Sequence, residues 1–516
     1  MLSVVGEKRR SCLLLVVACI LMFSLSTTTM NWVKYVSLRS TDAYDLGFYH
    51  NSAFNEAQGR LTTYVLVKAF FDKQDHEGPS VFRSNHFSPM RVLLLPQLYR
   101  VWPSIITLFF LQSLIIGLGA LPLFWFVSQR TGAPRLGLLL ALSYLLHPAV
   151  LHMGFNDYRP IQLGLSLALF ALYFHARRQP IPFGVATLLM LACRQEYIFL
   201  LALFGLINWR LASAPEHRLR WALGPVLLAL LWAGLTNAYY LYFYDRLWPL
   251  RAYAGASRPL GTLLLSLLER LPIFLRIMLL PAVVGLLLPE AFVAALPFVA
   301  GALDVLWPAF PHDHLQHLSP ALAAVFWAFA GGIVRLWPWL VQTRERVAWT
   351  QAVLLAAALL SFAQFGWGAA QAYLVGGVPR YAALTRLDAS LPADATVMVP
   401  KDLLARFSAH TRVITHESLP LGTNASLPYL EMRAILIELI SISDLVATQF
   451  GQEWLDALVM ESGRFLPVQI VRRFHLYRAR PDAPRPPDPD ARLQAILGWD
   501  QMSQTKRRWA DLRVGQ

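Results

Sequence analysis

The stretch that decides the fold class is "IITLFFLQSLIIGLGALPLFWFV", residues 105–127, an apolar run without a charged side chain. A helix needs about 20 such residues to cross the hydrocarbon core of a bilayer, so this run predicts a transmembrane helix. The whole chain shares its character, with 56% hydrophobic residues, 15% charged residues and a mean hydropathy of +0.45. These values lie outside the usual balance of soluble proteins. The sequence therefore predicts a mainly α-helical, polytopic membrane protein.

The other apolar runs raise the expected number of transmembrane helices to about eleven. Several runs are short, so the sequence gives their first and last residues only approximately. The first run follows a basic start and is expected to be an uncleaved anchor, with a cleaved signal peptide as the alternative. In chain order the runs span residues 13–32, 105–127, 136–150, 161–174, 181–193, 197–208, 221–244, 271–288, 291–306, 318–333 and 348–367.

Basic residues gather between the apolar runs. Lys+Arg 45 against Asp+Glu 31 gives a net charge of +14, but the chain lacks the basic stripes with interleaved aromatics that bind nucleic acid. The clusters indicate topology and contacts with lipid phosphates instead. They predict a plasma-membrane protein with a cytoplasmic N-terminus and an extracytoplasmic C-terminal region. The clusters comprise Lys8, Arg9, Arg10, Arg130, Arg135, Arg177, Arg178, Arg210, Arg218, Arg220, Arg335, Arg344 and Arg346.

The stretch "STDAYDLGFYHNSAFNEAQGR", residues 40–60, follows the first apolar run. From Asp45 onward, its apolar residues recur at helical spacing, with asparagines on the other face. This pattern predicts an amphipathic helix in the outer membrane interface. Two interpretations of Asp45 stay open, since a carboxylate at a helix start either caps the helix or is placed there for chemistry.

Charged residues also occur in turns that the apolar runs place near the membrane. Asp157 and Arg159 stand in "LLHPAVLHMGFNDYRP", and Arg194 and Glu196 in "ACRQEY" between two half-length runs. Those runs are too short for full crossings, so the second turn is expected at the floor of an outer cavity. Ionisable residues at such depth indicate a functional site. The alternative is an Arg–Glu pair that only fixes helix packing.

The order of five segments resembles a known family. They are "YDLGFYHNSAFNEAQGR", "NHFSPMRVLLLPQLYRVWPS", "LHPAVLHMGFNDYRP", "CRQEYIFLLALFGL" and "DHLQHLSPALAAVFWAFAGGI". Together they resemble the DUF2079 family of predicted polytopic membrane proteins, which in turn resembles the GT-C glycosyltransferases, over roughly residues 32–480. The chain departs from the family pattern at Arg159, where a His is expected, at Gln195, and at Leu318 after His317.

The resemblance implies an inverting transfer of a sugar from a polyprenyl-phosphate donor to an acceptor hydroxyl of a glycan, lipid or protein on the outer face. Asp45 would be the general base, because a hydroxyl nucleophile needs a nearby carboxylate. The donor phosphate and cavity would involve His86, Asp157, Arg159, Arg194, Glu196 and His317. No cofactor is certain and no metal is assigned, although Asp157 and Glu196 are possible ligands of a divalent ion. The three cysteines have neither disulfide nor zinc spacing.

Polar residues return after residue 367. Strand-length runs in "DATVMVP", "TRVITH" and "LPVQIVRRFHLYRAR" predict a small extracytoplasmic α/β domain over residues 380–480. It would follow a GT-C-like transmembrane domain over residues 1–370, whose external loop 33–104 carries the interfacial helix. A Pro/Asp-rich linker and terminal helix would occupy residues 481–516. A transporter or lipid flippase, and a non-catalytic membrane protein of the same fold, are the alternatives to a transferase.

Overall fold

The computed structural model divides the chain into two compact units. The helical unit comprises Met1–Val33, His86–Arg91 and Ile106–Val375, and the sheet unit comprises Lys34–Asn85, Val92–Ile105 and Gly376–Gln516. The structure describes residues 2–37, 43–59, 87–211, 218–244, 247, 287, 293, 295, 315–373, 378–392, 395–400, 403–410, 412–415, 444–448, 465–471 and 474–480.

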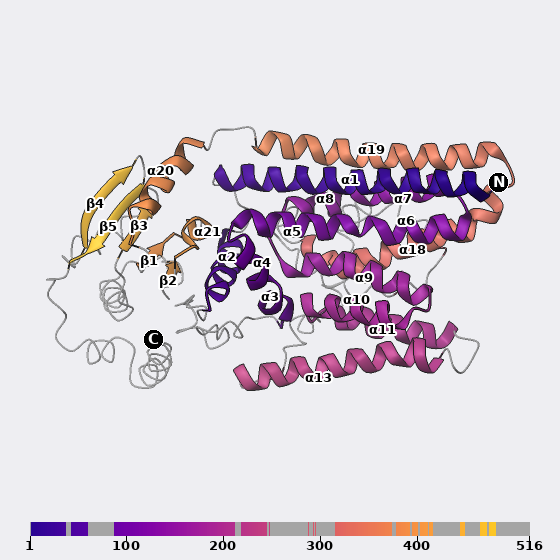
Figure 1. Ribbon diagram of the computed structural model, residues 1–516, viewed down its shortest axis with the longest axis horizontal. Helices are drawn as coiled ribbons and strands as arrows, with labels where there is room; N and C mark the ends of the chain where they lie inside the picture. The colour runs from indigo at the N-terminus through magenta and orange to yellow at the C-terminus, as the bar shows by residue number, and fades with distance from the viewer. Residues whose placement is uncertain are drawn as a thin grey trace, which may run out of the picture. The chain divides into compact units, whose positions relative to one another are not determined.

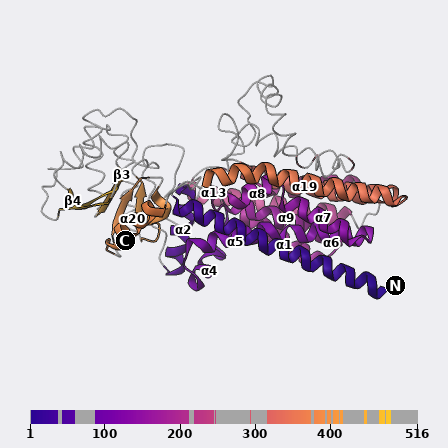
Figure 2. The ribbon, with the colours of Figure 1, turned by 90° about the horizontal axis from the view of Figure 1, so that it is seen from above.

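The helical unit is built from helices that run along it, and α1 and α19 are the longest of those that the structure describes (Figures 1 and 2). Proline stands at the first position of several of them, where its fixed φ suits a helix and its missing N–H has no partner to lose. The elements are α1 (Leu2–Val36), α5 (Ile105–Leu118), α6 (Ala120–Thr131), α7 (Pro134–Leu145), α8 (Pro148–Phe155), α9 (Pro160–Ala176), α10 (Pro180–Cys193), α11 (Tyr197–Leu211), the π-helix η2 (Leu219–Leu223), α13 (Gly224–Tyr244), the 3₁₀-helix η3 (Leu315–Leu318), α18 (Ser319–Leu340) and α19 (Arg344–Tyr373).

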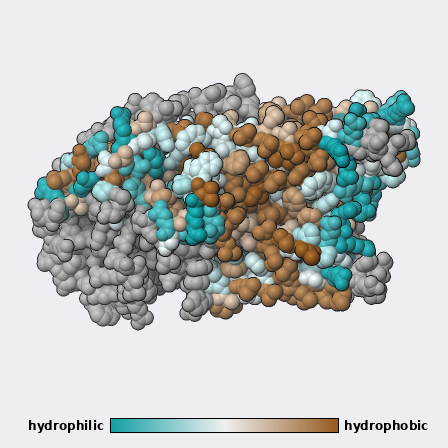
Figure 3. Space-filling view, viewed as in Figure 1, coloured by the Kyte–Doolittle hydropathy of each residue, from teal (hydrophilic) through white to brown (hydrophobic). Residues whose placement is uncertain are grey.

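Several helices of this unit are apolar enough to cross a membrane. Within the described residues, four satisfy both length and composition, namely residues 7–36, 105–131, 219–241 and 319–340. A fifth is obtained if α7 and α8, which meet at 53°, are taken as one broken span. Hydrophobic residues cover a broad band of the unit in Figure 3. The prediction of a mainly helical membrane protein is therefore confirmed, whereas the number of about eleven spans stays a prediction. The predicted runs 271–288 and 291–306 lie outside the described residues, apart from residues 287, 293 and 295.

Among the described residues, the sheet unit contains a five-stranded mixed sheet of order β2-β1-β3-β5-β4. β1 pairs in parallel with β2 and β3, and β5 pairs antiparallel with β3 and β4. The described elements are α2 (Ala43–Ala57), α4 (Leu95–Val101), α20 (Val378–Ala389), β1 (Thr396–Val399), α21 (Leu404–Phe407), β2 (Arg412–Thr415), β3 (Asp444–Thr448), β4 (Phe465–Val471) and β5 (Phe474–Ala479). The division of the chain into the two units falls within the short helix α3 (Pro89–Leu93), after Arg91.

The core of the sheet unit joins the strands to α20 and α21. It contains Leu384, Leu387, Val397, Phe407 and Leu476, all fully buried. The strands expected in residues 394–400, 411–416 and 466–480 are present. A separate domain over residues 380–480 stays a prediction, because the compact unit also contains residues 34–85 and 92–105. The predicted linker and terminal helix over 481–516 lie outside the described residues.

Candidate functional site

The turn between α10 and α11 holds a buried ion pair. Nε of Arg194 lies 2.8 Å from Oε1 of Glu196, and each side chain is only 7% exposed. Arg194 has an extended backbone and ends α10, and α11 begins directly after Glu196. The two residues are thus paired with one another, and both interpretations of the pair, a functional site or a support for helix packing, stay open. A buried pair of this kind is costly to break, because removing either partner leaves a charge inside the protein.

The connection between α8 and α9 is a second buried polar turn. Asp157 is 1% exposed and Arg159 is 8% exposed. Gln112 of α5 holds this connection in place, because its Nε2 donates to the carbonyls of Met153 (3.1 Å) and Asn156 (2.8 Å). Its Oε1 accepts from the N–H of Arg159 at 2.9 Å. One amide side chain therefore bonds three backbone groups at the end of α8 and in the connection that follows it.

Gln112 received no role in the sequence analysis. The signal was present, since Gln112 is the one amide side chain in the apolar run 105–127. Polar side chains of this kind inside membrane helices usually bond to neighbouring helices.

Tyr197 ties the two polar turns together. Its hydroxyl donates to the carbonyl of Ile161, in the first turn of α9, at 2.8 Å. Gly164 makes room for this contact, because a Cβ at that position would lie 2.7 Å from the Tyr197 hydroxyl oxygen. Since Tyr197 directly follows Glu196, the start of α11 is fixed against the start of α9. The predicted residues Asp157, Arg159, Arg194 and Glu196 accordingly belong to one region of the helical unit.

Ser88, in the sequence segment "HFSP", lies against the end of α10. Oγ of Ser88 donates to the carbonyl of Cys193 at 2.8 Å, directly before Arg194. The ring of Phe87 lies 5.1 Å from that of Tyr239 in α13. His86 itself lies outside the described residues. The motif thus contributes a support for the Arg194 turn, a role that the sequence analysis did not assign.

His317, the last predicted site residue of the helical unit, lies just before α18. His317 belongs to η3, is partly exposed, and stands in an element that contacts α8 and α9.

Within the described residues there is no group of three or more His, Cys, Asp or Glu side chains that would hold a metal ion. Asp157 and Glu196 therefore carry no metal proposal.

Asp45 lies in the first turn of α2 in the sheet unit and is partly exposed. The helix expected over this segment is present, and both of its faces are packed. Leu46 on the apolar face is fully buried, and so are Asn51 and Asn55 on the polar face. The structure describes the two units separately, so the role of Asp45 at the polar turns of the helical unit is a proposal.

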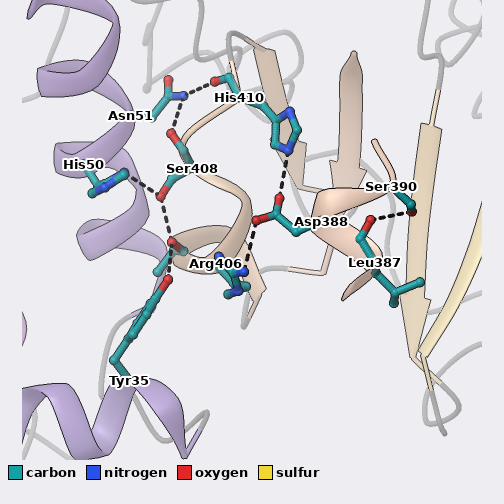
Figure 4. A network of polar contacts seen from close by, with 10 residues as sticks. Tyr35, His50, Asn51, Leu387, Asp388, Ser390, Arg406, Ser408 and His410 are labelled. Atoms are coloured by element: carbon teal, nitrogen blue, oxygen red, sulfur yellow. Dashed lines mark hydrogen bonds and ion pairs between the residues drawn. The ribbon is translucent and has the colours of Figure 1, made fainter. Parts of the chain in front are cut away.

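The polar face of α2 is bound to the segment 404–410 (Figure 4). Nδ2 of Asn51 donates to the carbonyls of Ser408 (2.9 Å) and His410 (2.7 Å). Nδ1 of His50 lies 3.0 Å from Oγ of Ser408. At Gly47 a Cβ would lie 2.8 Å from the backbone nitrogen of Ala405, so only glycine permits this approach of α2 to α21. Burial lowers the pKa of His50 to about 4, which keeps the imidazole neutral.

Segment 404–410 is in turn held by Asp388 of α20. Its two carboxylate oxygens accept from Arg406 (3.0 Å) and from Nε2 of His410 (2.9 Å), as Figure 4 shows. The Arg406 guanidinium also lies 5.1 Å from the centre of the Tyr381 ring. Within the sheet unit, the helix that carries Asp45 is therefore bound to segment 404–410, and that segment is bound to α20. These contacts cannot be predicted from local sequence patterns, because Asn51 and His410 are 359 residues apart.

The fold and the buried polar turns define an integral membrane protein with a polar site inside its helical unit. A family model described as "Predicted membrane protein (DUF2079)" matches residues 34–319. The chain belongs to this family, which confirms the resemblance noted in the sequence. No curated protein matches the chain.

Solved structures of similar fold come from Cupriavidus metallidurans. ArnT bound to undecaprenyl phosphate has 12% sequence identity and a TM-score of 0.52, over 90% of this chain and 99% of that chain. ArnT in the apo state has 13% identity and a TM-score of 0.50, over 89% and 97% of the two chains. At this identity the likeness concerns the fold alone, and it supports the expected GT-C-like architecture.

Proposed function

We propose that the protein is a membrane glycosyltransferase that moves a sugar from a polyprenyl-phosphate donor to an acceptor hydroxyl on the extracytoplasmic face of the plasma membrane. The observation that carries the proposal is the buried Arg194 turn, within a fold like that of ArnT, whose structure holds undecaprenyl phosphate. A guanidinium inside an apolar helical unit is a natural partner for a lipid phosphate, because its planar fork matches phosphate oxygens.

The reaction needs one base and one stabiliser of negative charge. The acceptor oxygen attacks the anomeric carbon of the sugar, and the bond from that carbon to the phosphate oxygen breaks. The acceptor proton passes to the base, and the polyprenyl phosphate leaves with the electron pair. The base has to lie within hydrogen-bond reach of the acceptor. Positive groups have to face the departing phosphate, where charge develops in the transition state.

Arg194 and Arg159 are proposed to face the phosphate. Glu196 accepts the Nε hydrogen of Arg194 at 2.8 Å and so orients the plane of its guanidinium. Gln112 fixes the backbone of Arg159 through the N–H at 2.9 Å. Both cations are therefore placed before a donor arrives, which lowers the free energy needed to organise the site. Arg159 replaces a histidine of the family pattern, and this exchange substitutes a permanent charge for a titrating one.

Asp45 is proposed as the base. It lies in the first turn of α2, where Asn51 and His50 fix the helix against segment 404–410. A rigid helix suits a general base, because small displacements of the base strongly reduce rate. His86 and His317 are proposed as further cavity residues.

The proposal is tested by the affinity of the detergent-solubilised protein for undecaprenyl phosphate. The variant is the double change Arg194→Gln and Glu196→Gln, which removes both charges of the pair together, so that neither is left inside the protein without the other. We expect the wild type to bind and the double variant to bind at least tenfold more weakly at an unchanged melting temperature. Equal affinity of the two proteins would contradict a phosphate role for this turn.

A transporter or flippase is the second candidate. The 53° bend between α7 and α8 and the short α10–α11 hairpin favour it, because transporters bind substrates at broken helices. Proteoliposomes that contain a labelled polyprenyl phosphate carrying its sugar separate the two functions. Movement of this lipid across the bilayer without loss of its sugar would favour the transporter.

A further inference from the structure

One end of the helical unit is rich in arginine. Nε2 of Gln129 in α6 donates to the hydroxyl of Tyr173 in α9 (2.9 Å), and Nε2 of His175 donates to the carbonyl of Trp221 in η2 (2.7 Å). These bonds place the ends of α6 and α9 beside η2. The α18–α19 turn and the start of α1 lie at the same end (Figure 1), where hydrophilic residues gather beyond the hydrophobic band (Figure 3). Exposed arginines here include Arg9, Arg10, Arg130, Arg135, Arg177, Arg178, Arg218, Arg220, Arg335 and Arg344.

The α18–α19 hairpin combines these charges with tryptophan. We define the Arg–Trp hairpin as residues 335–349, "RLWPWLVQTRERVAW", which holds three arginines, three tryptophans and the single acid Glu345. Trp339 is 51% exposed and Trp349 is 72% exposed. The α9–α10 turn carries Arg177 and Arg178 without any tryptophan in residues 174–183. The two basic turns therefore differ in their tryptophan content.

Arg346 is held in a fixed position on this hairpin. Its Nη1 donates to the carbonyl of Trp339 (3.2 Å) and to Oε1 of Gln342 (2.9 Å). The guanidinium carbon lies 4.3 Å from the centre of the Trp339 ring. A guanidinium that is stacked and hydrogen-bonded loses less rotational freedom when it binds an anion. The hairpin thus has a preformed cationic group beside an exposed aromatic ring.

The position of the hairpin favours a lipid over a soluble anion. Residues 319–340 form one of the helices that are long and apolar enough to cross a membrane, and the hairpin begins within its last turns. Tryptophan and arginine are enriched at this depth, where a ring contacts acyl chains and a cation contacts headgroups. A soluble anion would leave Trp339 and Trp349 exposed to water, whereas a phospholipid covers the rings and the charges together.

We propose that the Arg–Trp hairpin binds the phosphate of an anionic phospholipid in the leaflet at this end of the helical unit. Arg344 and Arg346 contact the phosphate, and Trp339 packs against the glycerol and upper acyl chain. The site is distinct from the buried Arg194 turn and does not depend on the proposed transferase function.

The test uses the full-length protein in a zwitterionic detergent, titrated with cardiolipin or with phosphatidylcholine and followed by native mass spectrometry. The variant Arg344→Gln with Arg346→Gln should bind cardiolipin more weakly, by roughly fivefold for each arginine. The matched control Arg177→Gln with Arg178→Gln removes the same charge from a turn without tryptophan and should leave the affinity near that of the wild type. Equal losses in both variants would overturn a specific site, as would equal binding of the two lipids.

A second variant separates the ring from the charge. Trp339→Leu keeps every arginine but removes the stacking partner of Arg346, and it should also weaken cardiolipin binding. Inorganic phosphate at constant ionic strength should not displace the bound lipid. Unchanged affinity of Trp339→Leu, or displacement by inorganic phosphate, would contradict the proposal. The changed residues lie at the surface or the turn, and unchanged melting temperatures in all variants would verify that folding is intact.

Discussion

Replacing Gln112 by methionine should destabilise the helical unit. Methionine has about the same length as glutamine and would stay buried, but it cannot make the three hydrogen bonds of the amide. These are the two bonds to the carbonyls of Met153 and Asn156 and the bond from the N–H of Arg159. At about 0.6–1.5 kcal/mol for each bond, the free energy of unfolding should fall by roughly 2–4 kcal/mol. The carbonyl and N–H groups stay buried and lose their bonds to this amide, which favours the upper part of this range.

The matched control for this change is Gln162→Met. Gln162 of α9 is as fully buried as Gln112, but its amide makes no hydrogen bond within the described residues. The same substitution there should be neutral or stabilising, because it replaces a buried polar group by an apolar one. Both variants are compared with the wild type by thermal unfolding in detergent. Equal melting temperatures for the two variants would refute the assigned role of Gln112.

Three further predictions concern the sheet unit and the α10 end. Gly47→Ala should cost about 1–3 kcal/mol of unfolding free energy, because its Cβ would meet the α21 backbone at 2.8 Å; Gly184→Ala, with no atom within 4 Å, is the control for thermal unfolding. The pKa of His50 falls from 6.5 to about 4 on burial, so the unfolded chain binds the proton more tightly. The free energy of unfolding should have its full value above about pH 6.5 and decrease by about 3 kcal/mol as the pH falls to about 4. A His50→Gln variant with the same pH dependence as the wild type would contradict this role of His50. Ser88→Ala should lose about 1 kcal/mol with the bond to Cys193, and Ser88→Thr should recover most of it; identical melting temperatures in all three proteins would argue against the contact.

The sequence predicted those parts of the fold that depend on local patterns. Apolar runs such as 105–127 identified membrane helices, and prolines at positions 134, 148, 160 and 180 begin helices as their chemistry requires. The strand-length runs after residue 367 were found in a sheet. The limits of the compact units could not be predicted, because α2 belongs to the sheet unit through contacts with a segment more than 300 residues away.

Local patterns also indicated some residues of the candidate site, but not those whose contacts are distant in the sequence. Arg194 and Glu196 attract attention because charge in an apolar run is rare, and their pairing is local. Gln112 and Asn51 have their roles only through distant backbone groups, the connection after α8 and segment 404–410. A neutral amide in an apolar run gives a weaker signal than a charge, and a glycine such as Gly47 gives none until its neighbour is known.

The most direct test of the proposed transferase is the identity of the lipid that co-purifies with the protein. Wild type and Asp45→Asn are extracted in mild detergent, and their bound lipids are identified by mass spectrometry. We predict a polyprenyl phosphate or its glycosylated form, with the glycosylated form enriched in Asp45→Asn because the donor is bound but not consumed. Bulk phospholipid alone in both samples would contradict the account.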